Sequence, residues 1–435
     1  MAVRVATKAV NTAFAGEMDL SYGRFAIIVV MKTNTRSIWF LAMVAAMGGF
    51  LFGYDTAVIN GAEQQIQKVW SLSGFMHGWV MSSALWGTVL GALFGGRVTD
   101  RFGRKPTLFG VGALYLVSAV WSGLAGGAYE LMIARFIGGL AVGCSSIAAP
   151  VYIAEISPAA SRGKLTALFQ FNVIFGMCVS QFVNWALGGL GESAWRWMLG
   201  AEAAPALLFT LLCPLLTESP RWLAMKVEKG EKVEGVEGFW VRANLKPILI
   251  AFLVAFFNQL SGINAVLYFA RRIFEMAGFS GETSLGIVAG MGVVNALATL
   301  AGVLLIDRLG RRTLLVIGGI GYVVSLFSCS AAFLLDCGGL AAAMVFLFVI
   351  SHMVGQGTVI WVLCAEVFPT RCRAQGQSVG SFTHWFFAAV VSFSFPVMAE
   401  RFAPWLIFGF FGVMMVLHLL WAIFVVPETK GRALT

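Results

Sequence analysis

Apolar runs of about 20 residues recur along the whole chain, and their length constrains the fold more than any other feature. Such a run matches a helix that crosses the hydrocarbon core of a bilayer. Inside lipid, a lone apolar segment must satisfy its own backbone polar groups, so each run is predicted to be helical. Only 12% of the 435 residues are charged and 59% are hydrophobic, whereas soluble domains carry about 25% charged residues. The chain is therefore predicted to be an all-α membrane protein and not a soluble enzyme.

Twelve runs are predicted to span the membrane: 37–59, 78–97, 106–125, 129–152, 165–187, 194–216, 246–269, 285–306, 313–335, 339–363, 377–397 and 403–426. The longest polar segment, 217–245, is predicted to be a short cytoplasmic linker between two six-helix bundles, 37–216 and 246–426. Residues 1–36 are expected to form a cytoplasmic extension and 427–435 a cytoplasmic tail. The extension does not resemble a signal peptide, because no small-residue cleavage site follows a proper apolar core. Met31 is a second candidate start of the chain.

The distribution of positive charge predicts the orientation. Of the 30 Lys and Arg residues, 24 lie in segments that are cytoplasmic if the N-terminus is cytoplasmic, five lie outside, and Arg135 lies within a span. Positive residues favour the cytoplasmic side, so both termini are predicted to face the cytoplasm, in the cell membrane. The net charge of +9 thus reports topology, and no nucleic-acid partner is expected. Neither the seven Cys nor the four His are spaced as metal ligands, so no metal, disulfide or cofactor is predicted.

Three short motifs occur twice in the same order. Asp100-Arg101-Phe102-Gly103-Arg104-Lys105, Ala154-Glu155-Ile156-Ser157-Pro158 and Glu218-Ser219-Pro220-Arg221 return as Asp307-Arg308-Leu309-Gly310-Arg311-Arg312, Ala365-Glu366-Val367-Phe368-Pro369 and Glu428-Thr429-Lys430-Gly431-Arg432, at offsets of 207, 211 and 210. A fixed order at a nearly constant offset indicates a duplicated six-helix unit in parallel orientation. Basic helix ends that merely follow the positive-inside rule would not require the accompanying acids.

The charged residues of these motifs are predicted to form a cytoplasmic gate. Acids of each half can pair with Arg residues of neighbouring helices when the inner ends of the helices close together. Such pairs are weak individually where water reaches them, but a network that forms in only one state biases a two-state equilibrium. The gate residues are Asp100, Arg104, Glu155, Arg162, Glu218, Asp307, Arg311, Glu366 and Arg373.

From about residue 37 to the end, the chain resembles the sugar porter family of the major facilitator superfamily. The resemblance is carried by 100–105, 150–155, 218–223, 259–264 and 427–431. That family contains animal facilitative glucose transporters and bacterial proton-coupled symporters for xylose, arabinose, galactose and glucose. The resemblance implies the major facilitator fold, with two pseudo-symmetric six-helix bundles, and a monosaccharide site between the halves near mid-membrane.

The positions of the family motifs assign candidate sugar-binding residues. They are Gln170, Gln259, Asn264, Asn295, Trp361 and Trp385, with Asn258 and His384 standing where the family usually has other amides. The chemistry agrees, because amide side chains both donate to and accept from hydroxyl groups, and aromatic rings suit the C–H faces of a sugar. The alternative is that the amides only bond helices together. The glycine in Ser261-Gly262 interrupts the seventh span and is expected to let it bend.

Asp55 and Arg135 are an acid and a base within spans of the same half. Embedded charges are costly and usually functional, so the two are predicted to pair, with Glu202 as a second acid sharing Arg135. In bacterial symporters that the chain resembles, the matching Asp is the protonation site and the matching Arg its modulator, which favours monosaccharide–proton symport by a monomer in the lipid bilayer. A static ion pair in a facilitative uniporter is the alternative. A membrane sugar sensor is a further one, although sensors usually carry long cytoplasmic tails.

Overall fold

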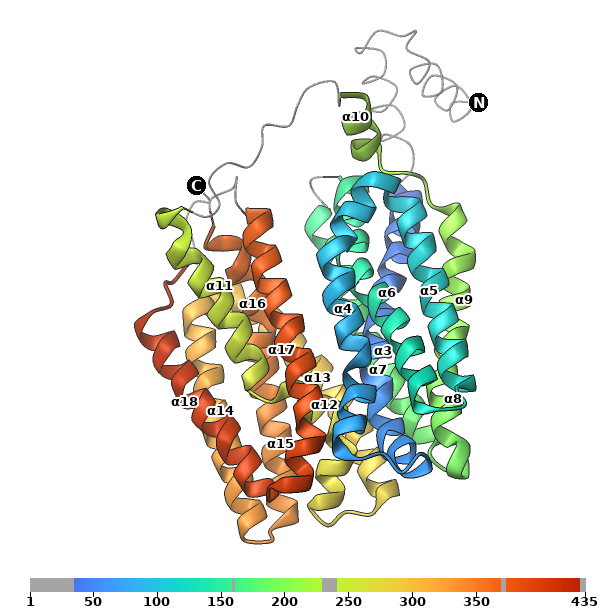
Figure 1. Cartoon of the computed structure of the whole chain (residues 1–435). Coiled ribbons are helices and arrows are strands. Elements are labelled where there is room, and N and C mark those ends of the chain that lie inside the picture. The colour runs from blue at the N-terminus through green and yellow to red at the C-terminus, as the bar shows by residue number, and fades with distance from the viewer. Residues whose placement is uncertain (1–34, 159–160, 229–240, 369–372, 431–435) are drawn as a thin grey trace.

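A computed structural model describes residues 35–158, 161–228, 241–368 and 373–430 of the chain. The described part is helical (Figure 1), and its helices are, in chain order, α3 (Thr35–Val69), α4 (Gly74–Phe102), α5 (Arg104–Leu124), α6 (Ala128–Ile156), α7 (Arg162–Leu187), η1 (Gly191–Ser193), α8 (Ala194–Gly200), α9 (Ala203–Leu212), η2 (Cys213–Leu215), α10 (Pro220–Glu228), α11 (Arg242–Leu260), α12 (Ile263–Met276), α13 (Gly281–Leu309), α14 (Arg311–Leu334), α15 (Gly338–His352), η3 (Met353–Gly357), α16 (Thr358–Glu366), α17 (Arg373–Arg401) and α18 (Pro404–Phe424).

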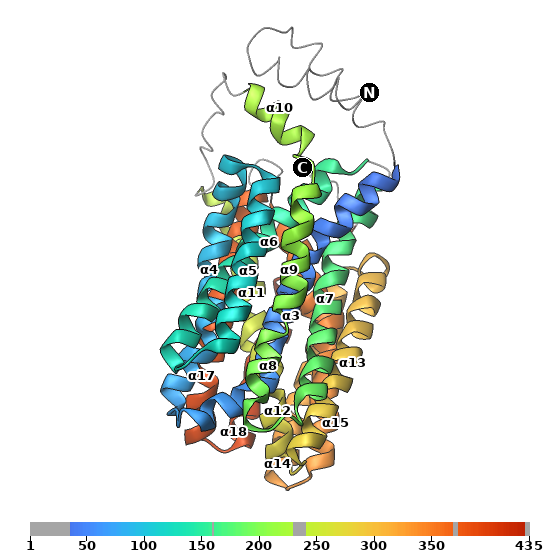
Figure 2. The same ribbon diagram turned by 90° about the vertical axis from the view of Figure 1, so that its right-hand side faces the viewer.

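Twelve segments within the described residues are long and apolar enough to cross a membrane, as the sequence predicts. They form two bundles, α3 to α9 and α11 to α18, that stand side by side with helix α10 beyond one end of them (Figures 1 and 2). We call this the α10 end of the molecule and the opposite one the far end. Large side chains such as Leu211 and Leu304 are exposed on the outside of the bundles, where lipid would cover them. The all-α, two-bundle prediction is thus confirmed, whereas the bundle boundaries remain predictions.

The first span is longer than predicted. Helix α3 continues to Val69, ten residues past the expected end at 59. Polar residues such as Asn60 and Glu63 end the apolar run, but both are fully buried, because they face the second bundle and not water. The end of the apolar run at residue 59 was therefore the wrong prediction of the helix end, because buried polar residues continue the helix.

Two other spans are interrupted inside the membrane. The seventh is split between α11 and α12 by Gly262, whose φ of +85° lies in the left-handed region that favours glycine. The predicted interruption is therefore present. The tenth contains the π-helical segment η3, Met353–Gly357, and such segments commonly occur at functional sites.

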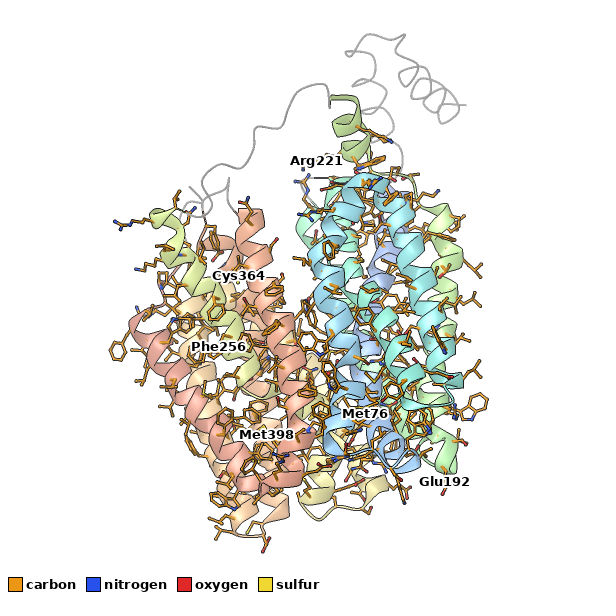
Figure 3. All side chains as sticks on the ribbon, viewed as in Figure 1. Met76, Glu192, Arg221, Phe256, Cys364 and Met398 are labelled. Carbon is orange, nitrogen blue, oxygen red and sulfur yellow. The ribbon has the colours of Figure 1, made fainter. Side chains whose placement is uncertain are left out.

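The two bundles meet toward the far end. There α4 packs on α17, α7 on α13 and α3 on α12. Gly78 of α4 lies so near α17 that a Cβ atom on it would come within 2.3 Å of the Phe393 carbonyl oxygen. Figure 3 labels Met76 of α4 and Met398 of α17 in this region, where side chains of the two bundles face each other. Toward the α10 end the ribbons of the two bundles diverge (Figure 1).

Candidate functional site

The repeated motif of the first half forms a compact ion-pair cluster at the α10 end. Arg104 donates from Nε and Nη2 to the two carboxylate oxygens of Glu155, each at 2.9 Å. Its Nη1 donates to Asp100 Oδ1 at 3.1 Å, and its backbone N–H donates to Glu218 Oε1 at 2.9 Å. Gly103 has a φ of +99°, and a Cβ atom there would lie 2.4 Å from Glu218 Oε2. The motif therefore needs glycine for both its backbone angle and its space.

The second half repeats this cluster atom for atom. Arg311 donates from Nε and Nη2 to Glu366 at 3.0 and 2.9 Å, and from Nη1 to Asp307 at 3.1 Å. Its backbone N–H donates to Glu428 Oε1 at 3.0 Å, and Gly310 has a φ of +94°. The equivalence of the two clusters supports the duplicated unit that the sequence indicates.

These predicted gate residues pair within each half. Among the described residues, no ion pair of either cluster joins the two bundles. Arg162 donates to the carbonyl oxygen of Ser157 at 3.4 Å, while the side chain of Arg373 lies outside the described residues. With the ribbons apart at this end, the clusters hold each bundle together, and the predicted gating role remains a hypothesis about another conformation.

An ion pair lies inside the first bundle, between α3 and α6. Arg135 Nη1 donates to Asp55 Oδ1 at 2.5 Å and Nη2 to the Asp55 carbonyl oxygen at 3.0 Å. Each side chain is 2% exposed. Glu202 is equally buried and interacts with both of them, and its Oε1 has no hydrogen-bond partner among the described residues. Two carboxyl groups and one guanidinium thus lie together in the bundle, so with both carboxyls ionised a single added proton makes the group neutral.

Three of the candidate amides form one cluster at the α11–α12 break. Gln259 Nε2 donates to Asn258 Oδ1 at 2.9 Å, and Asn264 Nδ2 donates to Gln259 Oε1 at 2.5 Å. All three residues are buried. Because the break at Gly262 separates α11 from α12, this cluster joins residues of two consecutive helices. The Asn258 Nδ2 group has no partner among the described residues, so it is free to donate to a ligand.

The candidate aromatic residues adjoin this amide cluster. His384 of α17 lies with Nδ1 3.0 Å from Gln259 Nε2, and its ring centroid is 5.0 Å from Trp361 and 4.9 Å from Trp385. Phe52 of α3 contacts Trp385 at 5.6 Å between centroids, which brings the first bundle to the same place. Six of the eight predicted binding residues are therefore gathered on the second bundle, facing the first.

Gln170 and Asn295 lie apart from the cluster. Gln170 is exposed and sits 11 residues, or about three helical turns, before Gln181 on the same face of α7. That face is directed at the second bundle, because Gln181 packs against Gly292 of α13: a Cβ atom added to Gly292 would lie 3.5 Å from Gln181 Cγ. Asn295 is buried on α13, and its Oδ1 has no partner among the described residues. Both amides therefore retain hydrogen-bonding capacity for a ligand.

The far end holds a cross-bundle ion pair that sequence reasoning missed. Arg272 of α12 donates from Nε to Glu63 Oε1 at 3.2 Å and from Nη2 to Oε2 at 2.8 Å. His77 Nε2 lies 2.9 Å from the same Oε2. Nearby, Asn60 Nδ2 donates to the Leu267 carbonyl oxygen at 2.5 Å. Glu63 and Arg272 lie just beyond the predicted spans 37–59 and 246–269, and were therefore placed in outer loops. The one sequence signal for their contact is that both spans could be extended by a few residues at little cost in hydropathy.

Comparisons with known proteins agree with this architecture. The family described as Sugar (and other) transporter matches residues 41–237 and 227–435. The D-xylose-proton symporter of Escherichia coli (strain K12) is 33% identical, over 92% of this chain and 95% of that protein. The arabinose-proton symporter of Bacillus subtilis is 32% identical, over 93% and 96%.

Solved structures show the same fold. A crystal structure of a D-xylose-proton symporter superposes with a TM-score of 0.82 at 33% identity, covering 90% of this chain and 99% of that one. The inward-open conformation of the xylose transporter from E. coli gives a TM-score of 0.81 at 32% identity, covering 91% and 98%. The likeness spans both bundles.

Proposed function

The chain belongs to the family of sugar (and other) transporters, and from that membership we propose that it imports a monosaccharide together with a proton. The relatives named above are symporters of xylose and of arabinose, both pentoses. The observation that carries the proposal is the buried pair of Asp55 and Arg135 with Glu202 beside it. A passive carrier has no need of an acid in this costly position.

The sugar is bound by the amide and aromatic cluster of the second bundle. Gln259, Asn258 and Asn264 present donors and acceptors from the break between α11 and α12, while Trp361, His384 and Trp385 supply flat apolar surface. Asn295 adds an acceptor. Gln170 reaches the sugar from the first bundle once the bundles close around it, which makes binding sensitive to the conformation of the whole transporter.

Transport proceeds by alternating access. The cytoplasm lies at the α10 end, as the excess of positive residues there supports, and the bundles rock against each other so that the site opens to one side at a time. A proton from outside neutralises the Asp55 carboxylate and releases Arg135. Loss of that proton to the cytoplasm restores the pair. The protein works as a monomer in the cell membrane, because one chain contains both bundles.

The replacement Asp55→Asn tests the coupling. An amide matches the protonated acid in size and polarity but cannot release a proton, so the variant should bind sugar and exchange it without concentrating it. Purified protein in proteoliposomes with an imposed pH gradient gives the measurement, and Arg135→Ala should impair active uptake more than binding. If Asp55→Asn concentrates sugar as well as the parent does, Asp55 is not the coupling site. If the parent moves sugar without moving protons, the protein is a uniporter.

A further inference from the structure

We propose that Glu63 and His77 form a second proton-binding site, separate from Asp55, which takes up a proton from outside when the far end of the transporter opens. The two residues lie on α3 and α4 of the first bundle, and both are fully buried. Arg272, which closes the site, belongs to the second bundle. The site is therefore divided between the parts that move.

The position of the proton follows from the hydrogen bond. A carboxylate oxygen only accepts, so His77 Nε2 at 2.9 Å from Glu63 Oε2 must carry a hydrogen. In the neutral imidazole the other nitrogen, Nδ1, then has a free lone pair. Nδ1 is buried and has no hydrogen-bond partner among the described residues. A proton added at Nδ1 produces an imidazolium that remains bonded to Glu63.

Charge balance sets the direction of the coupling. With the far end closed, Arg272 neutralises Glu63 and His77 is neutral, so an added proton would leave a buried positive charge. When the bundles separate, Arg272 leaves with α12 but His77 stays, because α3 and α4 belong to the same bundle. The remaining pair carries one negative charge, which a proton at His77 cancels. The open form therefore binds the proton more tightly, and by linkage the proton favours the open form.

Phe269 controls access to this site. Its ring packs edge-to-face on His77, with 6.1 Å between centroids, and stacks on Phe395 of α17 at 4.8 Å. Its backbone angles, φ −122° and ψ 21°, interrupt α12. Movement of α12 thus withdraws Arg272 and uncovers the His77 imidazole in one step, so water reaches Nδ1 only when the far end is open.

Other charged groups lie near this end of the molecule. Arg271 donates to Glu275 Oε1 at 2.9 Å and to the Gly61 carbonyl oxygen of α3 at 3.4 Å. The Glu400 carboxylate adjoins Gly74 at the start of α4. Among the described residues, the ion-pair partners of Glu63 are Arg272 and His77. Further charged groups toward the far end of the surrounding elements include Lys68 on α3, Glu192 on η1, Arg196 on α8, Glu282 on α13 and Arg401 on α17.

The test follows the separation of the bundles directly, without sugar. Spin labels on Tyr129→Cys and Leu335→Cys report the far end, because both residues are exposed there on different bundles. The protein carries Ser in place of its native cysteines and is held in lipid nanodiscs. Acidification from about pH 8 to about pH 5.5, the range in which His changes charge, should raise the ratio of long to short distances at least about fivefold, the lower end of usual coupling factors.

Three variants decide the origin of that response. His77→Gln and Glu63→Gln should each abolish it, whereas Glu275→Gln, which alters an acid bonded to Arg271 outside the pair, should retain it. A ratio that does not change with pH overturns the proposal, as does a response that survives His77→Gln or one that Glu275→Gln also abolishes. Should His77→Gln fail to fold, Glu63→Gln is compared with the same control. Because no sugar is present, the result is independent of the Asp55 experiment, and the two proposals can fail separately.

Discussion

At the α10 end the two bundles carry equivalent ion pairs, each formed within one bundle, whereas at the far end an ion pair joins one bundle to the other. Arg104 pairs with Glu155 and Arg311 with Glu366, each inside its own bundle. Arg272 instead reaches across to Glu63. The duplicated motifs thus stabilise each half separately, and the contact that holds the halves together lies elsewhere.

The sequence separations explain why the far end differs. Contacts across it join residues 207, 209 and 211 apart: Asn60 with Leu267, Glu63 with Arg272 and Asn60 with Arg271. These separations fall within the range of the motif offsets, 207 to 211, so the far end joins nearly equivalent positions of the two copies. Where equivalent positions meet about a two-fold axis, identical charges would face each other. At the far end the two copies must therefore carry different charges at equivalent positions. At the α10 end, where no ion pair of the described residues joins the two clusters, the charges of the two copies can be the same.

The largest expected effect breaks the far-end contact. Arg272→Ala leaves the buried Glu63 without its cation, and loss of one partner of a buried pair costs about 3–5 kcal/mol. The closed far end should lose stability by this order relative to the open one, so spin labels on both bundles should report a mostly open population at neutral pH. Glu275→Gln is the matched control, because Glu275 pairs with Arg271 in its own bundle where water reaches both. Equal opening in both variants would mean that the Glu63–Arg272 pair does not close this end.

The next largest effect concerns sugar affinity, at the proposed binding site between the two ends of the molecule. Gln170→Ala, Gln259→Ala and Asn264→Ala should each lose roughly 1–3 kcal/mol of binding free energy, since each leaves hydroxyl groups unpaired in a desolvated site. Gln259 and Asn264 are bonded to each other, so their double variant should lose less than the sum, whereas Gln170 should add independently. Calorimetry with a panel of pentoses and hexoses measures this. Three variants that bind sugar like the parent would show that the site is misplaced.

Disruption of an α10-end cluster should lower the stability of a bundle without opening the far end. Arg104 is 4% and Glu155 9% exposed, against 11% and 20% for Arg311 and Glu366. Arg104→Ala should therefore lower the thermal unfolding temperature more than Arg311→Ala, with a cost of about 1–3 kcal/mol. Glu155→Gln should leave the far end closed in the same labelling experiment. Far-end opening in Glu155→Gln would contradict the separation of roles between the two ends.

The smallest effect concerns Glu428, which closes the second cluster outside the membrane spans. Partial burial acts to raise the pKa of this carboxyl, but hydrogen bonds from the backbone N–H groups of Lys430, Arg311 and Arg312 outweigh it and hold the pKa below the ordinary value. A lowered pKa contributes stability above the unfolded-state value, and this contribution is lost as the pH falls through the folded-state value. Glu428→Gln should cost under about 1 kcal/mol near neutral pH and nothing in acid. An unfolding-temperature difference that persists in acid would contradict this assignment.

Much of the architecture could be predicted from local sequence. Apolar runs predicted twelve helices because a lipid environment demands length and hydrophobicity from each helix by itself. The offset between repeated motifs predicted equivalent bundles, and the paired clusters around Arg104 and Arg311 agree with it. Ser261-Gly262 predicted the break in the seventh span, because only glycine easily adopts the positive φ found there.

Contacts between distant segments could not be predicted in this way. Arg135 was expected to pair with Asp55 because each was costly alone, and that expectation concerns one bundle. Glu63 and His77 carried no such signal, since both stood near predicted loops where charge costs little. Their burial depends on how α3, α4 and α12 meet.

The sequence by itself determined which segments enter the membrane, where the chain repeats and which residue types can bind a sugar or a proton, because these follow from the chemistry of short segments. Only the tertiary structure decided which end of the molecule joins the bundles and which charges meet there. The reason is physical. Hydrophobicity and motif spacing act along the chain, whereas the energy of a buried charge such as Glu63 depends on a partner about two hundred residues away, and its position exists only after both bundles have packed.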